Sequence, residues 1–392
     1  MISVTEAWQR LLVHAQSGPV QILALADALG AVLAADIISP FDSPDFDMSA
    51  MDGYAVRMHP MQENTFLVTG EIQAGDTGSY VLNPGEAVRI FTGGMVPATA
   101  DAVVMQEWTT ETNGSLMVKG EIVQGANIRR RGSQLGKGDI ALSAGTEITA
   151  AGIGLLASLG QFSIPVFSRP SVSIITTGNE LLQPGDTLVN GQIYDSNTPF
   201  LQAALQETGI RNISCFRATD QRTELDSALD IALELSDFLL ITGGISVGKY
   251  DLVYDALNSR NIDIIFYKIS QKPGKPILAG KLGEKWVFAL PGNPASAGVC
   301  FYEYVYPVLR KYMGFSKPFL KRETAILSHM VKNKSGRAAF LRAAFSQGKV
   351  QIPAQQDSHI LQSFAMANCL VYLPQDTELL QAGDKVEIHW LP

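Results

Sequence analysis

The chain has 392 residues, of which 46% are hydrophobic and 17% charged, a composition typical of a well-packed protein rather than a disordered or fibrous one. This length exceeds what one ordinary core supports, so we expect several domains. The formal net charge of −8 argues against an extended nucleic-acid surface. Any anion site must therefore be a local cluster of positive groups in an acidic protein.

The cysteines and the N-terminal residues predict a cytoplasmic protein that does not use disulfides. Cys215, Cys300 and Cys369 are far apart and form no CxxC or Cys/His pair, which argues against a disulfide framework and a structural zinc site. The opening MISVTEAWQRLL lacks a basic stretch followed by an apolar run, so we expect no signal peptide. No apolar stretch reaches the roughly 20 residues of a membrane span, so we expect none.

The sequence pattern of the first 169 residues changes twice, from helical spacing to short strands and back to helical spacing. Ser3-x-x-Glu6 predicts a capping box, and apolar residues at helical spacing follow it to Ala15. A second helix is expected from about Leu23 to Ala35. Short strands punctuated by glycine fill residues 54–150, and helical spacing returns at 149–160. We therefore predict a helical linking domain made of residues 1–42 and 141–169, with a β-rich domain, 43–140, inserted between its halves.

Strands and helices alternate from residue 170 to 318. SVSIITTG predicts a strand, and a helix with Asn197 as its N-cap follows. The strands NISCFRA, DFLLITGG and IDIIFYKIS, a hairpin at KPILAGKLGEKWVFALPG and a closing helix with Pro294 at its first position complete the segment. Because the strands are apolar on both faces, we predict a central doubly wound α/β domain with a parallel sheet. Residues 319–392 alternate apolar and polar residues and predict a small C-terminal β-barrel.

Four glycine-containing loops follow the predicted central strands: TTGNEL, TGGISVGKYD, KISQKPGKP and LPGNPAS. In open α/β sheets, ligands bind outside the carboxyl ends of the strands. Glycine lets backbone N–H groups approach an anion, and a following helix N-terminus favours phosphate. Since neither GxGxxG nor GxxxxGK[ST] is present, we expect a phosphate-bearing small molecule bound in neither standard manner.

Charged residues accompany these loops. Four acids follow the strands, at Glu180, Asp195, Asp220 and Asp251, and as a group they suit Mg²⁺ shared with a substrate phosphate. A helix cap is an equal alternative for Asp251, and turn or cap positions suit Asp195 and Asp220. The positive counterpart, which we expect to bind the anion, is supplied by Lys268, Lys272 and Lys275.

The β-rich segment carries its own candidates. Asp52 lies in SAMDGYAV and Thr92 in IFTGG, and an arginine run follows a predicted strand at Arg129, Arg130 and Arg131. The run is either a solvated surface or a second anion clamp, and both alternatives stay open at this point.

SAMDGYAV, ITGGISVGKYD, KPGKP and LPGNPAS together resemble the molybdopterin molybdenumtransferases, the MoeA and gephyrin E-domain family. The resemblance covers nearly the whole chain, including AVVMQE, NIRRRG, GQIYDSN, GRAAFLR and SHILQSFAMANC. It implies an enzyme that inserts molybdate into adenylylated molybdopterin and releases AMP in a Mg²⁺-dependent reaction. It also implies an elongated homodimer whose site lies between the central domain of one subunit and the SAMDGYAV module of the other.

The resemblance assigns roles to matching positions. It implies catalytic residues at Asp52, Glu180, Asp220 and Asp251, with Glu180 and Asp251 at the metal. It implies contacts to substrate or phosphate from Thr92, Arg129, Arg130, Arg131, Lys268, Lys272, Lys275, Pro291, Pro294 and Ser358. From the strand-end loops themselves we expect further contacts by Gly243, Gly244, Ser246, Gly248, Gly292 and Asn293. Gln134 departs from the pattern, because the family usually has an acid there and an amide cannot replace a carboxylate as base or ligand. A lesser role for this position, a weaker enzyme, or a paralogue tuned to another oxyanion such as tungstate would each explain it.

Two other functions compete with this one. The central domain alone resembles the enzymes that adenylylate molybdopterin, but the additional domains argue against that activity. A non-catalytic scaffold is the second alternative, and no added linker or partner domain supports it. The protein partners implied are the adenylyltransferase and the apoproteins of molybdoenzymes.

Overall fold

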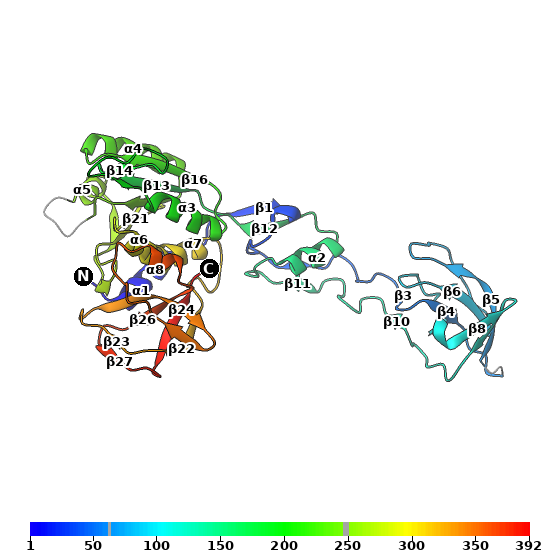
Figure 1. Cartoon of the computed structure of the whole chain (residues 1–392). Coiled ribbons are helices and arrows are strands. Elements are labelled where there is room, and N and C mark those ends of the chain that lie inside the picture. The colour runs from blue at the N-terminus through cyan, green and yellow to red at the C-terminus, as the bar shows by residue number, and fades with distance from the viewer. Residues whose placement is uncertain (62–63, 246–250) are drawn as a thin grey trace. The chain divides into compact units, whose positions relative to one another are not determined.

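The computed structural model describes residues 1–61, 64–245 and 251–392 (Figure 1). Ser246 and Gly248, both predicted to contact phosphate, lie outside these residues. The chain forms two compact units: unit 1 comprises Met1–Ile22, Gly30–Ala34 and Pro165–Pro392, and unit 2 comprises Leu23–Leu29 and Ala35–Ile164. The four predicted domain ranges divide the chain more finely and remain predictions.

Unit 2 is built on one six-stranded sheet in the order β7-β4-β6-β5-β9-β8. Its strands are β4 (Gly53–Val56), β5 (Thr65–Ile72), β6 (Glu86–Ile90), β7 (Ala102–Met105), β8 (Thr109–Thr112) and β9 (Ser115–Val118). Successive residues of β4 point to opposite faces, so Tyr54 and Val56 join one apolar cluster and Ala55 joins another. The predicted β-rich module is confirmed.

Unit 2 also contains shorter elements. Two antiparallel ladders pair β2 (Ile37–Ile38) with β11 (Ile140–Leu142) and β3 (Met48–Ser49) with β10 (Ile128–Arg129). The helix predicted at 149–160 is α2 (Ala150–Ser158), and the Thr149 hydroxyl caps it by accepting the Gly152 N–H at 3.1 Å.

The helix predicted from about Leu23 to Ala35 is wrong. The chain instead forms β1 (Val20–Ala24) and a single 3₁₀ turn (Leu25–Asp27). Gly30 has φ +71°, a left-handed conformation that ends any helix, and the Leu25 N–H donates to the distant Phe162 carbonyl at 2.9 Å. Long-range backbone pairing, which helical spacing does not reveal, determines the structure here.

Unit 1 contains the central sheet, in the order β16-β13-β17-β21-β20-β18. Its strands are β13 (Val172–Thr177), β16 (Ile213–Ala218), β17 (Phe238–Thr242), β18 (Asp263–Tyr267), β20 (Leu278–Leu282) and β21 (Lys285–Leu290). All run parallel except β20, which pairs antiparallel with both neighbours because it forms the predicted hairpin with β21. The sheet is therefore mixed and not wholly parallel, and the carboxyl ends of β13, β17, β18 and β21 share one edge.

Helices cover both faces of this sheet (Figure 1). Apolar side chains of α4 (Arg222–Leu235) and α5 (Leu252–Asn258) pack on one face, and those of α3 (Asn197–Glu207) and α6 (Pro294–Cys300) pack on the other. A π turn (Phe301–Val305) joins α6 to α7 (Tyr306–Tyr312). Asn197 is the first residue of α3 rather than its N-cap, because the Asp195 carboxylate accepts the free N–H groups of Asn197 and Thr198.

The N-terminal helix and the C-terminal strands complete unit 1. α1 (Val4–His14) begins as predicted, with the Ser3 hydroxyl accepting the Glu6 N–H at 3.1 Å, and buries its apolar face in the main core. Five strands pair around a closed ring, β24-β25-β22-β28-β26 and back to β24, which confirms the predicted barrel. They are β22 (Arg322–Leu327), β24 (Ala338–Ser346), β25 (Lys349–Gln351), β26 (Cys369–Leu373) and β28 (Lys385–Trp390).

Short elements lie between these. They are β12 (Ser163–Phe167), β14 (Leu181–Leu182), β15 (Ile193–Tyr194), β19 (Gln271–Lys272), β23 (Val331–Lys332), β27 (Leu379–Leu380), α8 (Gln362–Ala365) and a 3₁₀ turn (Gln106–Trp108). Across residues 1–61, 64–245 and 251–392, no helix has both the length and the apolar character needed to cross a bilayer.

Candidate active site

A cavity of about 850 Å³ opens in unit 1 at the edge where β13, β17 and β21 end. Its lining includes many of the residues singled out in the sequence, namely Glu180, Asp220, Gly243, Gly244, Lys275, Pro291, Gly292, Asn293 and Pro294. The parallel strands explain this convergence, since each delivers its following loop to the same edge.

The turn after β17 requires glycine. Gly243 and Gly244 have φ +88° and +62°, and a Cβ on Gly243 would lie 2.4 Å from the Thr177 carbonyl oxygen. A side chain there would clash with the backbone of the neighbouring strand. Both glycines therefore let this turn pack against β13 while it lines the cavity.

Two of the four candidate acids are free to meet a ligand. Glu180 and Asp220 line the cavity, and within the described residues neither carboxylate accepts a hydrogen bond or forms an ion pair. Asp195 also lines it, but its oxygens accept two N–H groups at the start of α3 and the Thr198 hydroxyl. Its carboxylate therefore serves as a helix cap.

Asp251 serves as the N-cap of α5. Its Oδ1 accepts the Tyr254 N–H at 3.0 Å and its Oδ2 accepts the Tyr267 hydroxyl at 2.9 Å, while the residue is only 8% exposed. Burial, and then the bond to Asp251, raise the pKa of Tyr267 well above its usual value, so this hydroxyl stays protonated and donates. The cap alternative is realised at Asp251.

The three candidate lysines lie in three different environments. Lys275 lines the cavity, whereas the Lys268 ammonium lies 4.4 Å from the centre of the Tyr267 ring. Lys272 instead lines a second groove, of about 710 Å³, which β24 and the loop after β22 help to form. That groove is rich in basic side chains: Lys272, His329, Lys332, Lys334 and Arg337. The sequence alone does not separate these two locations, because the KPGKP loop contributes to both.

Residues of the barrel reach the cavity as well. The Asn293 side-chain amide donates to the Ser358 hydroxyl at 3.0 Å, and the Ala295 N–H donates to the Ser358 carbonyl at 3.1 Å. Ser358 therefore lies beside the LPGNPAS loop, and the next residue, His359, lines the cavity. Our sequence reasoning missed His359, although it follows Ser358 directly in the SHILQS motif.

A buried arginine holds this Ser358 loop. Arg342 is fully buried in β24; its Nε donates to the Ser363 hydroxyl at 3.1 Å and its Nη2 to the Asp357 carbonyl at 3.0 Å. Burial lowers the pKa of Arg342 to about 10, against the opposing effect of the Asp357 charge, so the guanidinium remains a cation at neutral pH.

The start of α6 offers less to an anion than the sequence suggests. The Ala295 N–H is taken by Ser358, and the N–H groups of Ser296 and Ala297 both donate to the Asn293 carbonyl. The helix dipole remains at this end, but these first-turn donors are already used.

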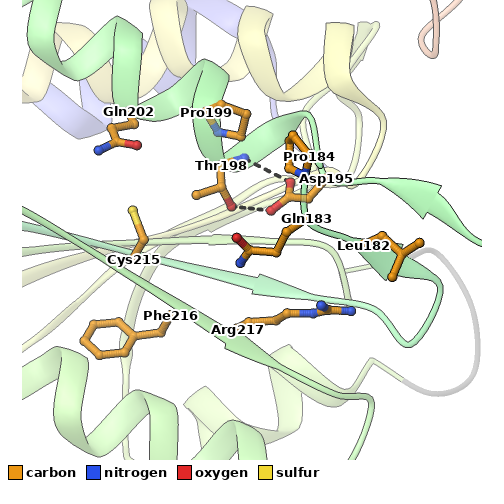
Figure 2. A pocket seen from close by; sticks show the side chains of 10 residues that line it. All are labelled: Leu182, Gln183, Pro184, Asp195, Thr198, Pro199, Gln202, Cys215, Phe216 and Arg217. Atoms are coloured by element: carbon orange, nitrogen blue, oxygen red, sulfur yellow. Dashed lines mark hydrogen bonds between the residues drawn. The ribbon is translucent and has the colours of Figure 1, made fainter. Parts of the chain in front are cut away.

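A smaller cavity of about 230 Å³ lies on the other side of Asp195 (Figure 2). Figure 2 shows the Thr198 hydroxyl and backbone turned towards the Asp195 carboxylate, with Cys215 and Arg217 coming from β16. The Arg217 guanidinium donates to the Leu181 carbonyl. None of the acids or lysines assigned to the substrate by resemblance lines this cavity.

In unit 2, Asp52 and Thr92 lie together. The Asp52 Oδ1 accepts both the hydroxyl and the N–H of Thr92, each at 2.7 Å. Both hydrogen bonds lower the pKa of Asp52, the one from the Thr92 hydroxyl more than the one from the Thr92 N–H, and this keeps the carboxylate ionised. Thr92 thus holds the Asp52 carboxylate in one orientation, as a charged hydrogen-bond acceptor.

The arginine run is largely committed to the fold of unit 2. Arg130 pairs with Asp47 at 2.6 Å and Arg131 with Asp42 at 2.8 Å. Both acids belong to the Ser/Pro/Asp-rich loop before SAMDGYAV, so the two ion pairs fix that loop. Exposed Gln134, in the position usually acidic, donates its backbone N–H to the Ser43 carbonyl at 2.9 Å.

Three family models match successive parts of the chain. They are the MoeA N-terminal region (domain I and II) over residues 2–160, a probable molybdopterin binding domain over 173–311, and the MoeA C-terminal region (domain IV) over 324–391. A molybdopterin molybdenumtransferase of Haemophilus influenzae is 36% identical over 378 residues, which cover 94% of this chain and 93% of that protein. This chain belongs to the molybdopterin molybdenumtransferase family.

Other relatives agree with this assignment. A molybdopterin molybdenumtransferase of Staphylococcus aureus is 32% identical and covers 99% of this chain and 95% of its own length. The crystal structure of a molybdopterin biosynthesis MoeA protein from Pyrococcus horikoshii matches with a TM-score of 0.86 at 29% identity, covering 100% of this chain and 99% of that one. Family membership makes the chain a transferase of molybdenum cofactor biosynthesis, and neither the adenylyltransferase nor the scaffold alternative is favoured.

Proposed function

We propose that this molybdenumtransferase inserts molybdate into adenylylated molybdopterin and releases AMP, with the unit 1 cavity binding the phosphates. The observation that carries the proposal is the convergence on one cavity of the glycine turns, Lys275 and two carboxylates that have no partner among the described residues. Lys275 and the backbone N–H groups of the loops would bind phosphate oxygens. The Ser358 hydroxyl, which accepts a hydrogen bond from the Asn293 side chain, would contact molybdate at the barrel side of the cavity.

The acids of this cavity fit a Mg²⁺ ion. Mg²⁺ is usually held by one or two carboxylates together with substrate phosphates and water. Glu180 and Asp220 offer two carboxylates that have no partner in the part of the chain that the structure describes. Asp251, expected at the metal together with Glu180, fits less well because both its oxygens already accept hydrogen bonds. When bound, the ion would neutralise phosphate charge and polarise the phosphoanhydride. In the described stretches no three His, Cys, Asp or Glu side chains gather as a metal site.

The proposed reaction consumes one water for each phosphoanhydride. The bond between the two phosphates breaks, AMP leaves, and the pterin keeps its own phosphate. The two thiols of the pterin bind molybdenum and lose their protons, and one molybdate oxygen leaves with these protons as water. Asp52, held ionised by Thr92, would act as the base or orient the attacking oxygen. Lys275 would stabilise the charge that develops on the phosphates.

A direct assay tests this function. Purified protein is supplied with adenylylated molybdopterin, molybdate and Mg²⁺, and AMP is measured by chromatography beside an authentic molybdenumtransferase. We expect AMP release that depends on both molybdate and the protein. Absence of AMP while the reference enzyme works would refute the proposal, and consumption of ATP with free molybdopterin would indicate an adenylyltransferase instead.

We propose further that the active form is a cytoplasmic homodimer in which Asp52 and Thr92 of one protomer complete the unit 1 cavity of its partner. Mixing inactive Asp52→Ala protein with inactive Glu180→Gln protein tests this. Random exchange of protomers should restore roughly a quarter of the wild-type rate, because half the dimers are mixed and each then has one intact site. Failure to regain activity after verified exchange would place all the required residues within one protomer. We expect the adenylyltransferase and apo-molybdoenzymes to be its protein partners.

A further inference from the structure

Within residues 1–61, 64–245 and 251–392, two polar atoms in the buried wall of the unit 1 cavity have no hydrogen-bond partner. They are the Thr177 hydroxyl oxygen, at the end of β13, and the side-chain carbonyl oxygen of Asn197, at the start of α3. Both residues line the cavity, and their exposed fractions are only 4% and 7%. Buried polar groups are nearly always paired, so two orphans in one cavity mark a place where a ligand supplies the missing partners.

The neighbours of Asn197 fix the orientation of its amide. Its Nδ2 lies 2.7 Å from the Gly292 carbonyl oxygen, and since a carbonyl can only accept, the amino group must face it. The same Nδ2 donates to the Thr242 hydroxyl at 2.8 Å, and that hydroxyl donates onward to the Pro291 carbonyl at 3.3 Å. The remaining atom, Asn197 Oδ1, is therefore a pure acceptor, and no donor among the described residues reaches it.

Thr177 supplies the complementary capability. A hydroxyl can donate as well as accept, and this one lies against the two glycines of the turn after β17, close to positions where any Cβ would clash with it. The adjacent Thr176 differs, because its hydroxyl is hydrogen-bonded to Thr198. The missing partner is therefore specific to Thr177 and not general to this end of the strand.

Phosphate and molybdate cannot satisfy Asn197. Ionised oxyanions only accept hydrogen bonds, so Asn197 Oδ1 requires an N–H or O–H donor from another part of the ligand. In an adenylylated pterin, the adenine and the pterin each carry an amino group beside a ring nitrogen. Such an edge presents a donor next to an acceptor, which an amide oxygen and a hydroxyl complement.

We infer that Asn197 and Thr177 recognise the amino-bearing edge of one heterocycle of the substrate. This inference rests on the proposed function, and it adds which chain atoms select the ring. The glycine turns and Lys275 hold the phosphates, while Asn197 and Thr177 distinguish a heterocycle with an amino group from one without it. They are specificity-determining residues that contact the substrate away from the bond that breaks.

Equilibrium binding tests this inference without requiring turnover. The probes are AMP, purine riboside 5′-monophosphate, which lacks only the amino group, and molybdopterin without the adenylyl group. Each is titrated calorimetrically, once in Mg²⁺-free buffer and once with Mg²⁺ added. The proteins are wild type, Thr177→Val, Asn197→Leu and the control Ser173→Ala. Ser173 lies on the same strand but bonds to the Ala232 carbonyl and does not line the cavity.

We expect Thr177→Val to unfold at or above the wild-type temperature, because an unpaired buried hydroxyl is replaced by a methyl group of similar shape. We also expect it to bind the recognised ring about tenfold more weakly, while Ser173→Ala binds as wild type. If adenine is recognised, wild type will prefer AMP over purine riboside monophosphate and Asn197→Leu will lose that preference. If the pterin is recognised, only molybdopterin affinity will fall.

Unchanged affinity of Thr177→Val and Asn197→Leu for every probe would overturn the inference. So would a loss that appears only when Mg²⁺ is added, since that would make Asn197 Oδ1 a metal ligand. Should Asn197→Leu fail to fold, Thr177→Val still decides the question. A wild-type protein that binds none of the probes, either with or without Mg²⁺, would instead refute the proposed function, so the two failures can be told apart.

Discussion

Charged residues in the two units have different surroundings. In unit 1, Glu180 and Asp220 line a cavity and have no partner within the described part of the chain. In unit 2, Arg130 and Arg131 are already paired with Asp47 and Asp42. An unpaired charge at a cavity is available to a ligand, whereas a paired one chiefly fixes a loop. Substitutions at Glu180 should therefore lower activity and leave stability unchanged. Substitutions at Arg130 should instead affect stability and leave activity nearly unchanged.

The largest effect is expected at Glu180. Glu180→Gln keeps the size of the side chain but removes a charge with no described partner, so the melting temperature should stay at the wild-type value. AMP release should fall by roughly a hundredfold or more, because a metal-held phosphate is worth several kcal/mol of charge stabilisation. Steady-state kinetics over a Mg²⁺ series checks this. A variant of normal activity would show that the unpaired acid is incidental.

A buried paired charge should affect stability alone. The His389 ring nitrogens lie 2.7 Å from a Glu303 oxygen and 2.8 Å from a Glu387 oxygen, so a protonated imidazole can donate one hydrogen bond to each carboxylate. Burial opposes this charge, but the attraction of Glu303 and the bonds to both acids raise the pKa of His389 to about 9.

Since that pKa lies above the usual 6.5, the stabilisation is complete below about pH 6.5 and is lost as the pH rises through about 9. The expected loss is on the order of 3 kcal/mol. Urea unfolding at pH 6, 7.5 and 9 measures it, and His389→Gln should lose the pH dependence. A wild-type stability that does not change over this range would contradict the ion pair.

Asp251 lies between these two classes, because it caps a helix and was also expected at the metal. Asp251→Ser retains a capping oxygen but removes the carboxylate, whereas Asp251→Ala removes both. Alanine should cost about 1 kcal/mol of stability, and serine much less. AMP release by the serine variant then measures the effect of removing the carboxylate charge alone. Wild-type activity would show that Asp251 acts only as a helix cap, and inactivity with normal stability would support a chemical role.

The smallest effect is expected in the arginine run. Arg130→Gln removes an exposed ion pair, and exposed pairs contribute little. We expect a slight decrease in the melting temperature and a KM for the adenylylated pterin within about twofold of wild type. Arg129→Gln is the matched comparison, because the Arg129 side chain is exposed in β10. A tenfold rise in KM for Arg130→Gln would restore the anion-clamp interpretation.

The sequence predicted features that depend on local pattern. Glycine-rich loops after parallel strands predicted the cavity edge, and the Ser3 cap predicted the start of α1. The 23–35 segment failed because its pairing partners are more than 100 residues away, so helical spacing gave no warning. The separation of Lys272 from Lys275 was equally hidden, since residues close together in one loop can line different cavities.

The missing hydrogen-bond partners of Thr177 and Asn197 could not be predicted from the sequence for a related reason. Asn197 resembled an N-cap residue, and only the positions of Thr242 and Gly292 show which end of its amide is free. Hydrogen-bond satisfaction depends on residues distant in the chain, so it becomes visible only in the folded structure.

A crystal structure of the protein with bound AMP tests the central claim most directly. We predict the phosphate at the unit 1 sheet edge, within hydrogen-bond distance of Lys275 and of the turns containing Gly243 and Gly292. A phosphate bound instead in the basic groove beside Lys332 and Lys334, with the sheet edge holding only water, would contradict it.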